Sequence, residues 1–207
     1  MNETLPSLAL VGLGAFHGLN PAMGWLFAVA LGLHRQSRTV VFVSLLPIAA
    51  GHALSIGVVA GLLAVAGILI PHGAVRIGAG LLLLVWAAYH WRLGHRHRVR
   101  FGMQTGLLGL AVWSFLMATA HGAGLMLWPA IMSSCLESSG SGAAPLAATV
   151  LVSAGIHTLA MAATTVLVAG LVYEWLGVGV LRQAWFNVDA VWIGALCLTG
   201  ISLLLSG

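Results

Sequence analysis

The chain has very little charge and no lysine at all. Of its 207 residues only 8 are basic and 4 acidic, and all 8 basic residues are arginines. A soluble domain carries roughly a quarter charged residues, about four times the 6% found in this chain. Because 60% of the residues are apolar, the composition excludes an ordinary soluble domain and predicts an all-α integral membrane protein.

Cysteine and long hydrophilic stretches are also scarce. Cys135 and Cys197 are the two cysteines, and their spacing is not that of a CxxC pair, so we infer no disulfide and disfavour thiol-relay chemistry. No hydrophilic stretch is long enough for a separate soluble domain, and residues 1–207 are therefore expected to form one membrane domain. Residues 1–7 lack a basic n-region, so we expect no cleavable signal peptide.

Apolar segments account for almost the whole chain. A membrane-spanning helix needs about 20 predominantly apolar residues. Pro21 interrupts the first predicted segment, which is over-long, and Pro129 lies near the far end of the fourth. Six segments are predicted in all, at about 5–33, 40–70, 75–91, 103–132, 145–173 and 185–205.

The arginines predict the orientation of these segments. With the N-terminus outside, seven of the eight arginines fall in inside loops, and only Arg76 lies outside. The positive-inside rule therefore places both termini outside an inner or cytoplasmic membrane, with the basic loop 92–102 in the cytoplasm. Arginines in short loops between spans indicate contacts with lipid headgroups, so we expect no nucleic-acid partner.

Four histidines within the predicted spans suggest an internal repeat. His17 and His52 are 35 residues apart, and His121 and His157 are 36 apart, so the two pairs are offset by 104 and 105 residues. Three spans per copy would turn the second copy the other way up in the membrane. The sequence thus predicts two inverted three-helix repeats, residues 5–93 and 103–205, an architecture of secondary transporters with a binding site near the bilayer midplane.

Imidazoles at membrane depth are candidate metal ligands. A neutral histidine binds Zn, Cu, Fe or Ni, and thioethers add softer character. The alternative is that each histidine hydrogen-bonds a neighbouring helix, and that the methionines fill the core. The predicted ligands are His17, His52, His121 and His157, with Asn20, Met23, Met117, Met161 and Asp189 as supporting residues.

The other histidines have simpler explanations. His95 and His97 alternate with arginines and have no acidic partner, which favours a solvated basic face. His34, His72 and His90 lie at predicted span ends and need no functional role. Asp189 begins the sixth segment, either as a second partner of the site or as a cap of the helix N-terminus.

The segments 17–24 and 51–56 resemble the first-half signature of nickel/cobalt efflux permeases of the NicO type. That family belongs to a broad set of small six-span transporters, which includes lysine-exporter-like proteins. The matching residues are His17, Pro21, Gly24, His52 and Ser55, whereas Asn20 and Met23 stand where the family has an acidic residue and a second histidine. The resemblance covers the first sixty residues and implies a metal-ion permease.

The leading hypothesis is therefore a transporter, and not an enzyme, that moves a soft or borderline transition-metal ion. The alternative is an integral-membrane metalloprotein or redox enzyme that uses the same histidines to hold a metal centre or haem. A carrier of a small organic or anionic solute is a third hypothesis. The sequence leaves open the metal, the coupling ion and whether the chain forms a homo-oligomer.

Overall fold

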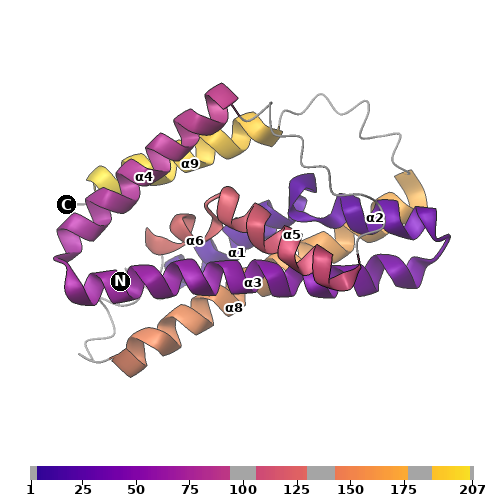
Figure 1. The fold of residues 1–207 in the computed structure, drawn as a ribbon, viewed down its shortest axis with the longest axis horizontal. Coiled ribbons are helices and arrows are strands. Elements are labelled where there is room, and N and C mark those ends of the chain that lie inside the picture. Colours follow the sequence, from indigo (N-terminus) through magenta and orange to yellow (C-terminus); the bar gives the residue numbers. More distant parts are fainter. Residues whose placement is uncertain (1–3, 94–105, 130–142, 177–187, 206–207) are drawn as a thin grey trace.

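The computed structural model describes residues 4–93, 106–129, 143–176 and 188–205, and these residues form helices joined by short turns (Figure 1). The prediction of an all-α chain is confirmed for this part of the molecule. Its main helices are α1 (Thr4–Leu19), α2 (Trp25–His34), α3 (Arg38–Leu69), α4 (His72–Leu93), α5 (Leu107–Ala120), α6 (Ala123–Met126), α8 (Ala143–Leu171) and α9 (Val188–Leu205). A 3-10 turn, η1 (Pro21–Met23), joins α1 to α2, and a π-helical turn, η3 (Val172–Leu176), follows α8.

Three helical stretches are long and apolar enough to cross a membrane: Arg38–Leu63, His72–Arg92 and Ala147–Trp175. Four shorter apolar helices accompany them. Large apolar side chains also face outward, among them Leu46, Leu108 and Leu151, each at least 70% exposed. Outward leucines on every long helix are typical of a surface in contact with lipid acyl chains, and these features together suggest a membrane protein.

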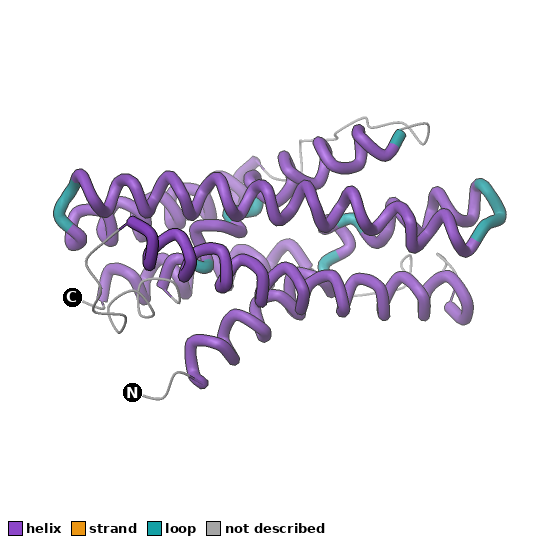
Figure 2. The backbone as a smooth tube through the Cα atoms, turned by 90° about the horizontal axis from the view of Figure 1, so that it is seen from below, coloured by secondary structure: helices purple, strands orange, loops and turns teal. Residues whose placement is uncertain are grey.

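The first apolar segment is broken in the middle, as Pro21 predicts. Helix α1 ends at Leu19, η1 begins at Pro21, and α2 begins at Trp25. Asn20 caps the turn, because its Oδ1 accepts a hydrogen bond of 2.9 Å from the Ala22 amide. Figure 2 shows loop segments near the middle of the molecule as well as at its two ends. The break therefore places polar backbone inside an apolar bundle.

The fourth segment is also broken, but at a different residue from the one the sequence suggested. The expected position was Pro129, whereas α5 ends at Ala120 and α6 begins at Ala123. Gly122 causes the turn, since its φ of 71° lies in the left-handed region that glycine adopts without a Cβ clash. This break directly follows His121, just as the first break closely follows His17.

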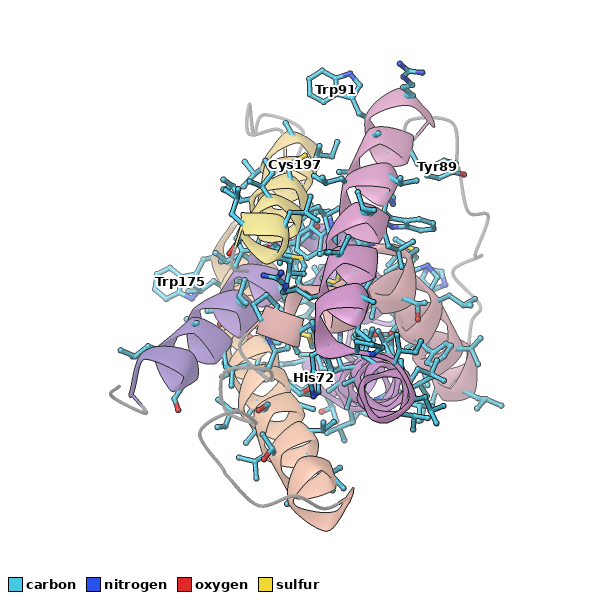
Figure 3. The ribbon with its side chains drawn as sticks, turned by 90° about the vertical axis from the view of Figure 1, so that its left-hand side faces the viewer. His72, Tyr89, Trp91, Trp175 and Cys197 are labelled. Atoms are coloured by element: carbon cyan, nitrogen blue, oxygen red, sulfur yellow. The ribbon has the colours of Figure 1, made fainter. Side chains whose placement is uncertain are left out.

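The helices pack in pairs. The most extensive contacts are those of α1 with α8, α3 with α5, and α4 with α9. Figure 1 shows α4 and α9 running side by side, apart from the long helix α3. In Figure 3 the exposed side chains of Trp91 and Trp175 project away from this bundle. Because α8 packs against both α1 and α3, the surfaces that these helices turn toward α8 form the interior in which the site lies.

Several predictions fall on residues whose structure is not described. Cys135, His95 and His97 lie outside the described ranges. So does most of the basic loop 92–102. Asp189 belongs to the first turn of α9, but its side chain lies outside the described part of the chain.

Candidate functional site

Three of the four predicted histidines meet inside the bundle. His17 lies near the end of α1, His52 in α3 and His157 in α8, and all three side chains are fully buried. The ring centroids are 5.5 Å apart for His17 and His52, 4.8 Å for His17 and His157, and 5.7 Å for His52 and His157. We call this group the three-histidine pocket. Residues separated by up to 140 positions in the sequence thus form one cluster.

Backbone hydrogen bonding orients His17. Its Nδ1 lies 2.9 Å from the Leu13 carbonyl oxygen, one helical turn earlier. A carbonyl oxygen only accepts, so Nδ1 carries the proton and Nε2 carries the lone pair. Nε2 is buried without a hydrogen-bond partner. Metal-ligating histidines commonly donate their second ring nitrogen to a backbone carbonyl in this way.

His52 and His157 have buried ring nitrogens that make no hydrogen bond. Neither nitrogen of either ring has a partner within hydrogen-bonding distance and angle, although the Leu10 carbonyl interacts with the His157 ring. Together with Nε2 of His17, five ring nitrogens are therefore unpartnered within one cluster. An unpartnered buried polar group costs about 1–3 kcal/mol. This accumulation calls for a ligand that binds several imidazoles at once.

A close helix contact at Gly14 brings His157 up to α1. A Cβ at position 14 would meet the His157 carbonyl oxygen and the Ala160 Cβ. Only glycine leaves the room for α8 to approach α1 this closely, as small residues do where two membrane helices meet. The sequence therefore specifies the distance between two of the three histidines as well as their identity.

The fourth histidine, His121, lies beside the pocket and not in it. Its Nδ1 is 2.8 Å from the Met117 carbonyl oxygen, the same arrangement that orients His17. Its ring is 5.4 Å from the Trp192 ring and 5.9 Å from the His90 ring. The prediction that four imidazoles share one site thus differs from the geometry, which groups three and leaves His121 next to Trp192.

The supporting residues have mixed positions. Asn20 is buried and caps η1, while its Nδ2 has no hydrogen-bond partner. Met23 and Met161 are both buried, and Met161 lies one turn beyond His157 on α8. Met117 is only partly buried, and its carbonyl contributes the bond to His121. Of the supporting residues, Asn20 and Met161 are the nearest in sequence to a histidine of the three-histidine pocket. Asn20 follows His17 by three residues, and Met161 follows His157 by four.

Two residues near the site were not singled out by the sequence. Trp192 contacts the His17 ring at 4.5 Å, and its Nε1 donates a hydrogen bond of 3.1 Å to the His121 carbonyl. His90, which was expected to need no explanation, has its Nε2 2.9 Å from the Ala120 carbonyl oxygen. Trp192 lies only four residues after the start of α9 at Val188, where a tryptophan fits an interfacial belt, so the sequence carried no signal for its contact with His17.

The side chains as they stand do not form a metal-ligating group. Within the described residues, no three His, Cys, Asp or Glu side chains are arranged to hold a metal ion. The ring spacing is nevertheless suitable: metal–nitrogen bonds of about 2.0–2.1 Å place two ligating ring centroids roughly 5 Å apart. The spacing of the rings thus fits an ion, although the three side chains do not form a ligand set as they stand. Comparisons with protein-family models, with curated proteins and with solved structures found no match to this chain.

Proposed function

We propose that the protein is a membrane transporter that moves a soft or borderline transition-metal ion through the three-histidine pocket. The observation that carries this proposal is the burial of five unpartnered ring nitrogens on three contacting imidazoles. A purely structural cluster would have satisfied these nitrogens with backbone or side-chain partners. Neutral imidazole is a common ligand for metals of this class.

Binding requires the rings to turn but not to move apart. The centroid distances of 4.8–5.7 Å already bracket the separation of roughly 5 Å expected for rings that share one ion. A rotation about the Cβ–Cγ bonds of His52 and His157 would redirect their nitrogens, and for His157 it would also change the interaction with the Leu10 carbonyl. His17 is already held with Nε2 as its lone-pair nitrogen. His17 is therefore the fixed ligand, and the other two are adjustable.

The proposal includes six spans arranged as two inverted repeats. The helix pairing supports this, because exchanging the two halves maps the α1–α8 contact onto the α5–α3 contact and the α4–α9 contact onto itself. The two breaks support it too, since His17 and His121 each contact the carbonyl four residues earlier next to a broken helix. Inverted repeats of this kind bind their substrate between the halves.

The proposed setting is an inner or cytoplasmic membrane with both termini outside. It follows from the arginines of the sequence and the positive-inside rule. The resemblance of segments 17–24 and 51–56 to NicO-type permeases belongs to the same proposal. Its matched residues His17 and His52 both contribute rings to the three-histidine pocket.

The alternative is a metalloprotein that holds a redox metal or haem on the same residues. A porphyrin between two axial histidines would have to separate rings that are now in contact at 4.8–5.7 Å. Contacting rings favour one small ion. We therefore expect no Soret band in the absorption spectrum of the purified protein, and a Soret band would favour the haem alternative.

The test is metal binding followed by uptake. The purified full-length protein is loaded separately with Zn²⁺, Ni²⁺, Co²⁺ and Cu⁺, and bound metal is measured by elemental analysis. We expect one ion per chain for at least one metal, and at least a 100-fold loss of affinity when His17, His52 and His157 are all replaced by Ala. The matched control is His72→Ala, which removes an exposed histidine and should leave binding unchanged.

Proteoliposomes that contain a metal-sensitive dye then distinguish transport from static binding. Uptake of the bound metal should depend on the same three histidines. If the triple variant binds metal as tightly as the unchanged protein, the three-histidine pocket is not the metal site. Binding without uptake would favour the metalloprotein alternative.

A further inference from the structure

Trp192 occupies the space between the three-histidine pocket and His121. The indole is almost fully buried, with 2% of its surface exposed. Its ring meets the His17 ring at 4.5 Å and nearly at a right angle, and it meets the His121 ring at 5.4 Å. A solute leaving the pocket toward His121 would therefore encounter this indole first.

The indole is held by two specific contacts. Its Nε1 donates to the His121 carbonyl at 3.1 Å, and its ring stacks on Phe16 at 5.6 Å with an interplanar angle of 5°. Phe16 is the neighbour of His17 on α1, and the His121 carbonyl belongs to the break between α5 and α6. The position of the indole is thus coupled to both broken helices.

The backbone that carries Trp192 belongs to a different helix pair from the pocket. Helix α9 makes its most extensive contacts with α4, whereas α1 and α8 pack on each other. A shift of the α4–α9 pair relative to α1 and α8 would withdraw the indole from His17. Such relative motion of helix groups is how inverted-repeat transporters alternate access.

Beyond the indole, further rings lead toward the surface. The His90 ring is 5.9 Å from that of His121, and the Tyr89 ring is 5.9 Å from that of His90. Tyr89 is 37% exposed. The order is therefore pocket, Trp192, His121, His90 and then the exposed edge of α4.

We propose that Trp192 is the gate of the three-histidine pocket, and that its indole must swing away before a bound cation can pass toward His121 and His90. The identity of the solute as a metal cation rests on the proposed function. The closing of the pocket rests only on the ring contacts of Trp192. The two statements can therefore fail separately.

The test measures access to the pocket with a thiol reporter. His52→Cys is introduced into the full-length chain with Cys135 and Cys197 changed to Ser. His52 is chosen because the contact between His17 and Trp192 then remains. Labelling by a small cationic methanethiosulfonate should accelerate at least tenfold on Trp192→Ala. Trp192→Phe retains a ring but loses the Nε1 donor, and we expect at least a threefold acceleration.

Two controls separate a gate from general loosening. Trp86→Ala removes another indole whose Nε1 donates to the same break, at the Ala120 carbonyl, but whose ring contacts are with Tyr89 and His90. Ser44→Cys places the reporter at a buried position two turns away on α3. Neither Trp86→Ala with the reporter at position 52, nor Trp192→Ala with the reporter at position 44, should change the labelling rate more than twofold.

Unchanged labelling at position 52 in Trp192→Ala overturns the gate, and so does equal acceleration by Trp86→Ala. If Trp192→Ala is not monodisperse, Trp192→Phe alone decides, and unchanged labelling in that variant overturns the gate. Metal binding is measured on the variants with the native histidines. If Trp192→Ala accelerates labelling but the variants with the native histidines bind no metal, Trp192 is still the gate of the pocket, for a solute other than a metal ion. That result would contradict the proposed function.

Discussion

At the residue scale, the informative feature is a set of nitrogens without partners. His17 has one ring nitrogen on a backbone carbonyl and one unpartnered, while His52 and His157 have neither nitrogen hydrogen-bonded. In an apolar bundle each such atom destabilises the protein by about 1–3 kcal/mol. Several unpartnered ring nitrogens in one cluster therefore lower the stability of the empty protein, and a ligand that binds these nitrogens would restore it.

Replacing one of these rings by an apolar side chain should therefore stabilise the protein without its ligand. We predict that His157→Leu raises the midpoint of thermal unfolding of the metal-free protein in detergent, because two unpartnered nitrogens disappear and the volume is nearly kept. The same variant should lose metal binding by at least tenfold. A drop in the unfolding temperature would indicate that His157 is a structural residue.

At the element scale, the close approach of α1 and α8 sets the spacing of the pocket. We predict that Gly14→Ala lowers the unfolding temperature by several degrees and weakens metal binding at least tenfold, because the new methyl group collides with the His157 carbonyl. The measurements are thermal unfolding and metal titration. Gly12→Ala is the matched control on the same helix, since nothing lies within 4 Å of a Cβ there. Equal effects of the two variants would contradict this explanation.

The break between α5 and α6 depends on the backbone of Gly122. The φ of Gly122 is 71°, which lies in the left-handed region. An alanine in this region destabilises the folded protein by about 1–2 kcal/mol, whereas an asparagine is tolerated better. We predict that Gly122→Ala destabilises the protein and that Gly122→Asn destabilises it less, as measured by thermal unfolding. The space around a new Cβ is adequate, with Leu196 at 3.4 Å, so crowding should not reverse this order.

The sequence predicted the elements better than their breaks. The helices α3, α4 and α8 begin and end within a few residues of the predicted segments, because long apolar runs have few alternatives in a membrane protein. Pro21 was recognised because proline removes a hydrogen bond. Gly122 was not recognised, since only its φ separates it from the many helical glycines.

The sequence also predicted only part of the site. Equal spacing selected His17, His52 and His157, which do converge, but spacing carries no information on ring direction. It therefore could not separate His121 from the others. It also missed Trp192 and His90, whose roles come from contacts between helices far apart in the sequence.

At the scale of the whole molecule, the pairing of α1 with α8, α3 with α5 and α4 with α9 is what an exchange of halves would produce. The six spans that we propose would place both termini on the same side of the membrane. We predict that a cysteine added at either terminus of a cysteine-free variant is labelled in intact cells by a membrane-impermeant maleimide. Gln36→Cys, in the exposed turn between α2 and α3, should react only after permeabilisation. Opposite accessibility of the two termini would contradict six spans.

The most direct measurement of the central claim is X-ray absorption spectroscopy of the protein loaded with the metal that it binds most tightly. The account predicts a ligand shell with three imidazole nitrogens at about 2.0–2.1 Å, which disappears when His17, His52 and His157 are replaced. A shell without imidazole, or one that survives the triple replacement, would show that the three-histidine pocket is not where the metal binds.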